Sequence, residues 1–102
     1  MHVIARKPLI DFGALYPDSK SSLRSWWKVM KHNRYRTPHE VRADFPSASF
    51  LGDELTVFNI GGNKYRLVAF MVYRTGLVYV DAVYTHEEYE RLVRAGLLGT
   101  NY

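Results

Sequence analysis

Two short stretches in the second half of the chain carry residues that could move protons and hold a phosphate. Lys64 and Arg66 stand two positions apart, so a strand would place both side chains on one face. His86 and Tyr89 stand three positions apart, which is about one helical turn. Cleavage of RNA without a metal needs a base, an acid and a cation on the phosphate. These four residues supply such groups and are the candidate catalytic set.

Each of these side chains also has an ordinary structural explanation. A strand arginine such as Arg66 is more often solvated or ion-paired than catalytic. Lys64 could simply follow a turn, His86 could begin a helix, and Tyr89 could lie at the edge of the core. No single residue therefore supports an enzyme.

Candidate RNA contacts lie in two places. Asn59 and Asn63 precede Lys64, one before and one within a glycine-rich turn. The second group occupies positions i, i+4, i+8 and i+11 of one predicted helix face, and it consists of Lys20, Arg24, Lys28 and Lys31. Such a stripe is usually only a solvated face. The net charge of +4, with nine arginines among fourteen cations, nevertheless suits phosphate contacts.

Apolar spacing and turn residues predict the elements of the first half of the chain. A short strand is expected at His2–Ala5, and a helix is expected from Pro8. A second helix, capped by Asp18 or Ser19, and a short third one, capped by Thr37, should follow. The second helix has the clearest pattern, because an apolar stripe occurs at i, i+3, i+4 and i+7; its members are Leu23, Trp26, Trp27 and Met30.

The second half of the chain predicts strands. They are expected at Leu55–Ile60, Lys64–Tyr73 and Leu77–Tyr84, and Thr85–Glu88 is a capping box that opens a last helix ending near Gly96. Helices segregated from an antiparallel sheet make an α+β domain. We therefore expect one domain over residues 1–102, with N-terminal helices on one face of a three- or four-stranded antiparallel sheet, a short C-terminal helix, and an open, polar second face.

Composition and motifs exclude several classes of function. The 102 residues contain no cysteine, and the four histidines lack metal-ligand spacing, so neither a metal nor a cofactor is expected. No phosphate-binding glycine loop and no serine-hydrolase motif occur. The N-terminus lacks the apolar run of a signal peptide, and no run approaches the ~20 apolar residues of a membrane helix. A cytoplasmic protein without membrane contact is expected.

Three separated motifs resemble the HigB toxin family. Val57–Val68, with the sequence VFNIGGNKYRLV, is similar to the family's VFNI-x-GNKYRLV string. Gly76–Val80 resembles its GxVY strand, and Thr85–Tyr89 resembles its THxEY motif. Thr37–Val41 also matches TPxEV, after a basic helix that bears tryptophan. The motifs occur in order, and the resemblance covers nearly the whole chain.

The resemblance implies a RelE-like α+β fold and endonucleolytic cleavage of mRNA, commonly on the translating ribosome. It implies neutralisation by a HigA-type antitoxin protein, with operator DNA contacted only through the antitoxin complex. Arg66 matches the strand arginine that would clamp phosphate, and Lys64 matches the lysine beside it. His86 matches the histidine that would act as general acid or base, and Tyr89 matches a tyrosine that would assist it.

Two other functions fit the same residues. A ParE-like inhibitor of gyrase would use this scaffold without catalysis and would leave mRNA intact. A plain RNA-binding module would depend on the basic helix more than on Arg66 or His86, and its binding would be sensitive to salt. The proton-transfer groups favour the ribonuclease. Because Asn59 stands where RelE has a strand lysine, and Thr85–His86 replaces its basic C-terminal pair, the acid and base roles are not assigned singly.

Overall fold

The computed structural model describes residues 1–52 and 54–96, and in this part of the chain four α-helices pack with a single five-stranded sheet. Residues 97–102, which the expected domain includes, lie outside the described residues. In chain order the elements are β1 (His2–Ile4), α1 (Lys7–Leu15), a 3₁₀ turn (Pro17–Ser19), α2 (Lys20–His32), α3 (Pro38–Asp44), β2 (Ser49–Leu51), β3 (Leu55–Ile60), β4 (Tyr65–Val72), β5 (Leu77–Thr85) and α4 (His86–Arg94). The α+β class is therefore confirmed.

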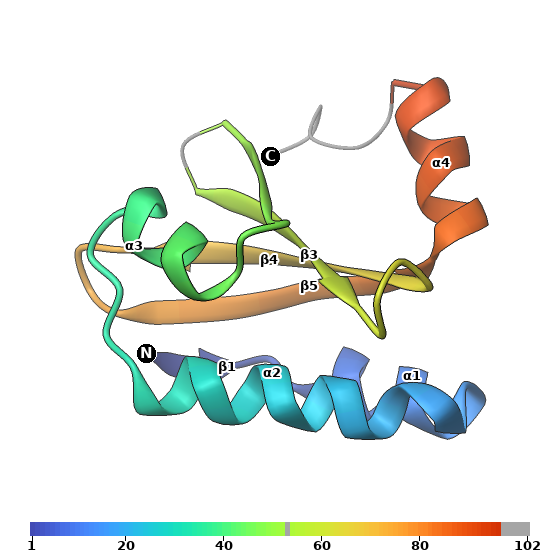
Figure 1. The fold of residues 1–102 in the computed structure, drawn as a ribbon, viewed down its shortest axis with the longest axis horizontal. Helices are drawn as coiled ribbons and strands as arrows, with labels where there is room; N and C mark the ends of the chain where they lie inside the picture. The colour runs from blue at the N-terminus through green and yellow to red at the C-terminus, as the bar shows by residue number, and fades with distance from the viewer. Residues whose placement is uncertain (53, 97–102) are drawn as a thin grey trace.

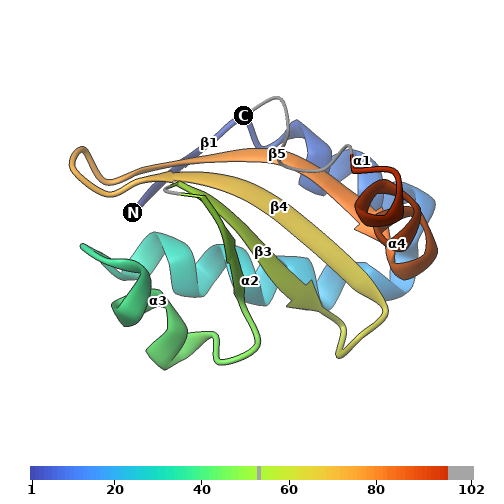
Figure 2. The ribbon, with the colours of Figure 1, turned by 90° about the horizontal axis from the view of Figure 1, so that it is seen from above.

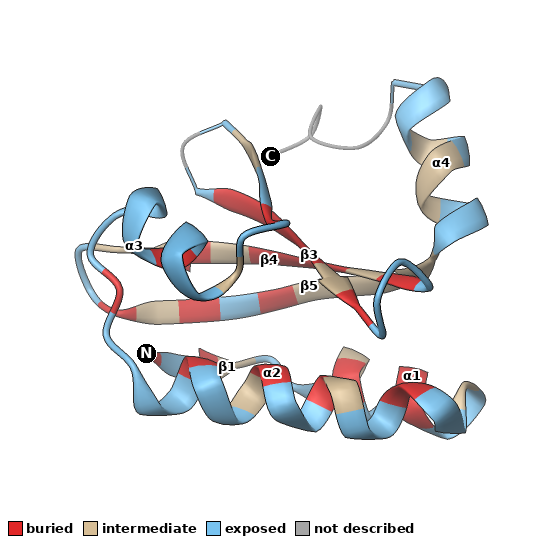
Figure 3. Ribbon diagram, viewed as in Figure 1, coloured by how far each residue is buried: buried red, intermediate tan, exposed pale blue. Residues whose placement is uncertain are grey.

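The helices α1 and α2 form a layer against one face of the sheet, while α4 rises on the other side from the end of β5 (Figures 1 and 2). The predicted apolar stripe of α2 turns inward, since Leu23, Trp26 and Met30 are buried. These side chains meet alternate residues of β4, among them Leu67 and Met71, in the main core. Figure 3 shows buried positions on α2 and along the strands of the sheet above it. Trp27, the fourth member of the stripe, is only partly buried.

The sheet contains more strands than the sequence predicts. Its strand order is β1-β5-β4-β3-β2, and β1 pairs with β5 in parallel whereas all other pairs are antiparallel. The expected strand at His2–Ala5 is confirmed as β1, whereas β2 was not predicted, and each of them has three residues. Strands of this length carry little alternation, and the β1–β5 pair joins the two ends of the fold, so no local signal reports the pairing.

The second sheet face is less polar than expected. Leu55, Val57 and Val68 are buried there in a separate small cluster, and partly buried side chains pack against it; these are Leu51, Phe70, Tyr84 and Tyr89. An apolar floor therefore lies on the side of the sheet from which α4 rises.

A β-bulge shifts the side-chain alternation of β5. Val68 pairs with Ala82, but the next residue, Ala69, pairs with Val80, so β5 contains one extra residue, Asp81. Val78 and Val80 face the main core before the bulge, and Val83 faces it afterwards. Tyr84 consequently lies opposite Arg66 on the second face.

The expected cap of α2 is confirmed in position but forms no capping hydrogen bond, whereas the other two caps form theirs. Ser19 occupies the N-cap position, but its hydroxyl donates to the Tyr16 carbonyl oxygen at 2.7 Å, because the 3₁₀ turn leads into α2 with helical backbone angles. Asp18 binds residues of β4 instead. Thr37 accepts from the Glu40 N–H, as predicted. Among the described residues, no helix is long and apolar enough to cross a membrane.

Candidate active site

Arg66, His86 and Tyr89 come together where β4 begins and α4 starts. Arg66 Nη2 donates to His86 Nδ1 at 3.0 Å. The Arg66 guanidinium carbon also lies 5.7 Å from the centre of the Tyr89 ring, within the range of a cation–π contact. Its Nη1 donates to the carbonyl oxygens of Asn63, at 3.0 Å, and Tyr65, at 3.2 Å. The arginine is thus held by its neighbours, and it links the other two side chains.

The start of α4 is fixed by two sets of hydrogen bonds. Thr85 Oγ1 accepts from the Glu88 N–H at 3.2 Å, and the Glu88 carboxylate accepts from the Thr85 N–H at 3.0 Å, which completes the predicted capping box. The His86 N–H donates to the Lys64 carbonyl oxygen at 3.0 Å. These bonds tie His86 to the beginning of β4.

Replacing Thr85 with alanine should destabilise the protein through this cap. The loss of an N-cap oxygen costs about 1 kcal/mol in the free energy of unfolding, which corresponds to a fall of about 4–8 °C in Tm for a domain of this size. Thr85→Ser keeps the hydroxyl and should melt within about 2 °C of the wild type. Thermal unfolding followed by circular dichroism measures both, and equal melting of Thr85→Ala and wild type would contradict the cap's contribution.

The bond from Arg66 determines the proton arrangement on His86. Because a guanidinium only donates, Nδ1 is the acceptor, and the proton of the neutral ring sits on Nε2. Nε2 lies 4.0 Å from the Glu90 carboxylate on the next turn of α4. The imidazole is exposed, so both ring nitrogens are near solvent.

Two tyrosines on this face keep their protons at neutral pH. Burial raises the pKa of Tyr89, and Arg66 partly opposes that shift. Burial also raises the pKa of Tyr84, assisted by the negative charges of Asp81 and Glu88. Tyr89 is therefore a hydrogen-bond donor beside the guanidinium rather than a base. The cluster can bind an anion through Arg66 and exchange protons through His86 and Tyr89.

The two asparagines predicted to contact RNA lie beside this cluster. Asn59 is the cross-strand partner of Arg66, so both side chains point to the second sheet face. Asn59 Nδ2 donates to Asn63 Oδ1 at 3.5 Å. Asn63 follows Gly61 and Gly62, whose φ angles of +62° and +70° suit residues without a Cβ.

Lys64 does not point at Arg66. Its Nζ lies 3.3 Å from Asp18 Oδ2, and the Tyr65 hydroxyl donates to Asp18 Oδ1 at 2.7 Å. Lys64 and Asp18 line an open hollow of about 620 Å³ that His86 also borders. The lysine is therefore held in this hollow beside His86 by a residue of the turn before α2.

The Tyr65–Asp18 bond should make stability depend on pH at both ends of the range. The bond from Tyr65 holds the pKa of Asp18 below its usual 3.8, so the stabilisation is present above that value and is lost as the pH falls through the lowered pKa. The same bond raises the pKa of Tyr65 above 10.0, so the stabilisation is lost as the pH rises through the raised value. The Tm of the wild type should be higher than that of Asp18→Asn at pH 7, and the difference in Tm should shrink in strong acid. A constant difference from pH 7 down to pH 2 would contradict this assignment.

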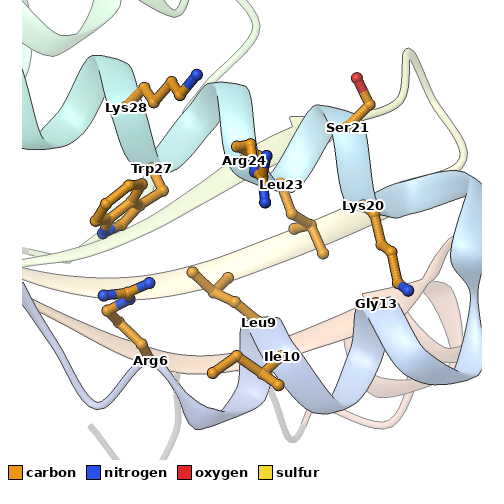
Figure 4. Close-up of a pocket in the computed structure, with 10 residues that line it drawn as sticks. All are labelled: Arg6, Leu9, Ile10, Gly13, Lys20, Ser21, Leu23, Arg24, Trp27 and Lys28. Carbon is orange, nitrogen blue, oxygen red and sulfur yellow. The ribbon is translucent and has the colours of Figure 1, made fainter.

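The four cations of α2 lie away from the cluster. Lys20, Arg24 and Lys28 border a groove between α1 and α2, on the helical layer and not on the second sheet face (Figure 4). Lys31 Nζ stands 4.7 Å from the centre of the Trp27 ring on the same layer. The predicted RNA contacts thus form two separate surfaces.

Residues 1–52 and 54–96 contain no group of three histidine, aspartate or glutamate side chains that could hold a metal ion. Two residues near the cluster were not predicted from the sequence. Asp18 lies 46 positions from Lys64 in the chain, and no sequence pattern predicts such a pair. Tyr84 reaches the second face only because of the bulge, which simple alternation does not predict.

Comparisons with known proteins cover most of this structure. A family model described as HigB_toxin, the RelE-like toxic component of a toxin-antitoxin system, matches residues 19–92. The chain is 34% identical over 92 residues to a protein of Escherichia coli (strain K12) named mRNA interferase toxin HigB, covering 88% of each chain. It is equally similar to the mRNA interferase HigB of Shigella flexneri. A protein of Escherichia coli O6:H1 (strain CFT073), also named mRNA interferase HigB, is 29% identical over 92% of this chain and 93% of its own.

Proposed function

The chain belongs to the HigB family of RelE-like toxins of toxin-antitoxin systems, and on this basis we propose that it is an endoribonuclease that cleaves mRNA at the Arg66–His86–Tyr89 cluster. The observation that carries the proposal is the direct bond between the Arg66 guanidinium and the His86 imidazole, with Tyr89 beside them. A cation, a proton acceptor and a proton donor then face one point. The relatives named mRNA interferases support the choice of substrate.

In the proposed reaction, the 2′-oxygen of one nucleotide attacks the adjacent phosphorus. The O2′–P bond forms while the P–O5′ bond breaks, the 2′-hydroxyl gives its proton to a base, and the leaving 5′-oxygen receives a proton from an acid. The products are a 2′,3′-cyclic phosphate and a 5′-hydroxyl end. Negative charge grows on the phosphate oxygens, and Arg66 is placed to stabilise it.

We assign the base to His86 and the acid to Tyr89. In the free protein His86 Nδ1 already accepts a bond from Arg66. When the guanidinium turns to the phosphate, that nitrogen becomes available to the 2′-hydroxyl proton. Tyr89 retains its proton because burial raises its pKa, so it can donate to the leaving oxygen. Asn59 and Asn63 would bind the neighbouring nucleotides, and Lys64 would contact the RNA strand from the hollow that it shares with His86.

The cellular context follows from the same family. We propose that cleavage takes place in the cytoplasm on translating ribosomes and that a HigA-type antitoxin neutralises the protein, with operator DNA bound only through the antitoxin complex. Lys20, Arg24, Lys28 and Lys31 form a second basic surface, which would face ribosomal RNA in the free protein and for which acidic residues of the antitoxin would compete. Comparing the cleavage of one mRNA with and without ribosomes tests whether cleavage depends on the ribosome.

The test of the proposed function is cleavage of a transcript by the purified protein, with products mapped by primer extension and the new 3′ ends analysed for cyclic phosphate. Discrete new ends inside coding sequence are expected. Growth arrest with intact transcripts and DNA damage signalling would instead support a gyrase inhibitor, and salt-sensitive RNA binding without products would support a binding module. Either of these two results would overturn the ribonuclease.

A further inference from the structure

A groove of about 750 Å³ runs between α1 and α2 (Figure 4). Its floor is apolar and its rim is basic. The floor consists of Leu9, Ile10, Leu23 and Trp27, and the cations that border it are Arg6, Lys20, Arg24 and Lys28. No acidic residue is among the residues that line it. One end of the groove closes where Gly13 lets the stem of Lys20 approach α1, since a Cβ at that glycine would lie 3.1 Å from the lysine Cγ.

One apolar residue at the edge of this groove is open to solvent. Leu9 and Leu23 are buried and Trp27 is partly buried, whereas Ile10 is 65% exposed. An apolar surface laid over Ile10 would remove it from water, which is favourable. The groove therefore suits a ligand with apolar groups on one side and negative charge at the edges.

The aromatic residue of the groove is already occupied by cations. The Arg6 guanidinium lies 4.3 Å from the centre of the Trp27 ring, and Lys31 Nζ lies 4.7 Å from it. A nucleobase that stacked on this ring would have to compete with these cations. The remaining floor is aliphatic, and it offers no ring face for a base. An apolar side chain fits this floor better than RNA does.

From this combination we propose that the groove between α1 and α2 binds an acidic amphipathic helix of the antitoxin partner. An amphipathic helix lays its apolar face into a groove through residues at i, i+3, i+4 and i+7. Its acidic side chains would then meet Lys20, Arg24 and Lys28 at the rim. The inference rests on the family's antitoxin partner and is independent of how the catalytic cluster works.

The location of the groove has a direct consequence for inhibition. The groove lies on the helical layer, whereas Arg66, His86 and Tyr89 lie on the second sheet face. A helix held in the groove does not contact these three residues. Affinity for the antitoxin and access of RNA to the catalytic cluster are therefore separable properties of this fold.

The experiment uses three probes of matched length with the full chain. The first is an acidic amphipathic helical peptide of leucine and glutamate, of roughly 18 residues or five turns; the second is a scrambled peptide of the same composition without an apolar face; the third is a single-stranded RNA. Binding is followed by tryptophan fluorescence, because Trp27 lines the groove while Trp26 is buried. The amphipathic peptide should bind at least about tenfold more tightly than the scrambled one.

Variants locate the binding to the groove. Ile10→Asp should lower the affinity for the amphipathic peptide by about tenfold or more. The variant protein should melt at the wild-type temperature and cleave RNA at the wild-type rate. The double variant Arg24→Glu, Lys28→Glu should lower this affinity further. Arg36→Glu, a single charge reversal on an exposed residue outside the groove, should leave the affinity of the peptide unchanged.

The proposal is overturned if the scrambled peptide binds as tightly as the amphipathic one, or if Ile10→Asp binds like the wild type. It is also overturned if the RNA binds the groove more tightly than the amphipathic peptide and loses affinity in the double variant, because the surface is then a nucleic-acid site. None of these readouts requires cleavage, so failure of this proposal is distinguishable from failure of the proposed ribonuclease.

Discussion

Arg66→Ala should lower the rate of RNA cleavage by about 10²–10³-fold, since removing a preorganised donor from a developing oxyanion has effects of this size. The same substitution frees His86 Nδ1 from its 3.0 Å bond and removes the cation beside Tyr89. Binding of RNA should weaken much less than cleavage, because the charge acts mainly in the transition state. Single-turnover cleavage of a short transcript, measured beside equilibrium binding, separates the two effects.

Two further variants give this prediction its controls. Arg66→Lys keeps the positive charge but lacks the planar fork that reaches His86 and the carbonyl oxygens of Asn63 and Tyr65. It should remain at least about tenfold slower than the wild type. Arg74→Ala, at the opposite end of β4 in an exposed turn, should cleave normally. Wild-type rates in a folded Arg66→Ala protein would remove the arginine from the mechanism.

His86→Ala should slow cleavage by about 10²–10⁴-fold, which is the usual contribution of one general acid or base. The side chain is exposed at the start of α4, and its contacts are a bond from Arg66 and a 4.0 Å approach to Glu90. The fold should therefore survive, and Tm should change by only a few degrees, roughly what a surface substitution costs. Primer extension on an abundant transcript after induction should lose the new 5′ ends, and growth should recover.

The matched control for this histidine is His39→Ala. His39 is exposed on α3 and lies outside the cluster, so its removal tests whether any surface histidine matters. Full cleavage by His39→Ala together with loss in His86→Ala places the effect at the cluster. A toxic His86→Ala protein that still cuts at the same positions would refute the assigned role.

The cluster of Arg66, His86 and Tyr89 contains residues that local rules mark in the sequence. Arg66 and Asn59 share a face through strand alternation. His86 follows a capping threonine, Thr85, whose capping box is recognisable in the sequence. The meeting of β4 and α4 then brings the two motifs together. Local rules thus predict which strand or helix carries each candidate side chain.

The remainder of the site depends on contacts between distant segments. Asp18 holds Lys64 and Tyr65 across 46 and 47 positions of sequence, so the lysine that alternation places beside Arg66 is directed to Asp18 instead. The parallel pairing of β1 with β5 joins residues that are still more distant in sequence, such as His2 and Leu77. Such contacts are decided by the packing of the whole chain, and neither periodicity nor capping encodes them.

The bulge at Asp81 fixes the phase of the end of β5 in a way that point substitutions elsewhere do not reveal. Because β5 holds one residue more than its partner at this place, the strand changes phase between Val80 and Val83. A regular strand of the same length would keep simple alternation, turning Val83 toward the second face and Tyr84 toward the core. The helix that follows would then begin with the opposite side-chain phase, with His86 directed away from Arg66. Deleting Asp81 would remove the bulge and its extra residue together and keep the pairing of β4 with the end of β5, so homologous toxins should either keep both or lack both.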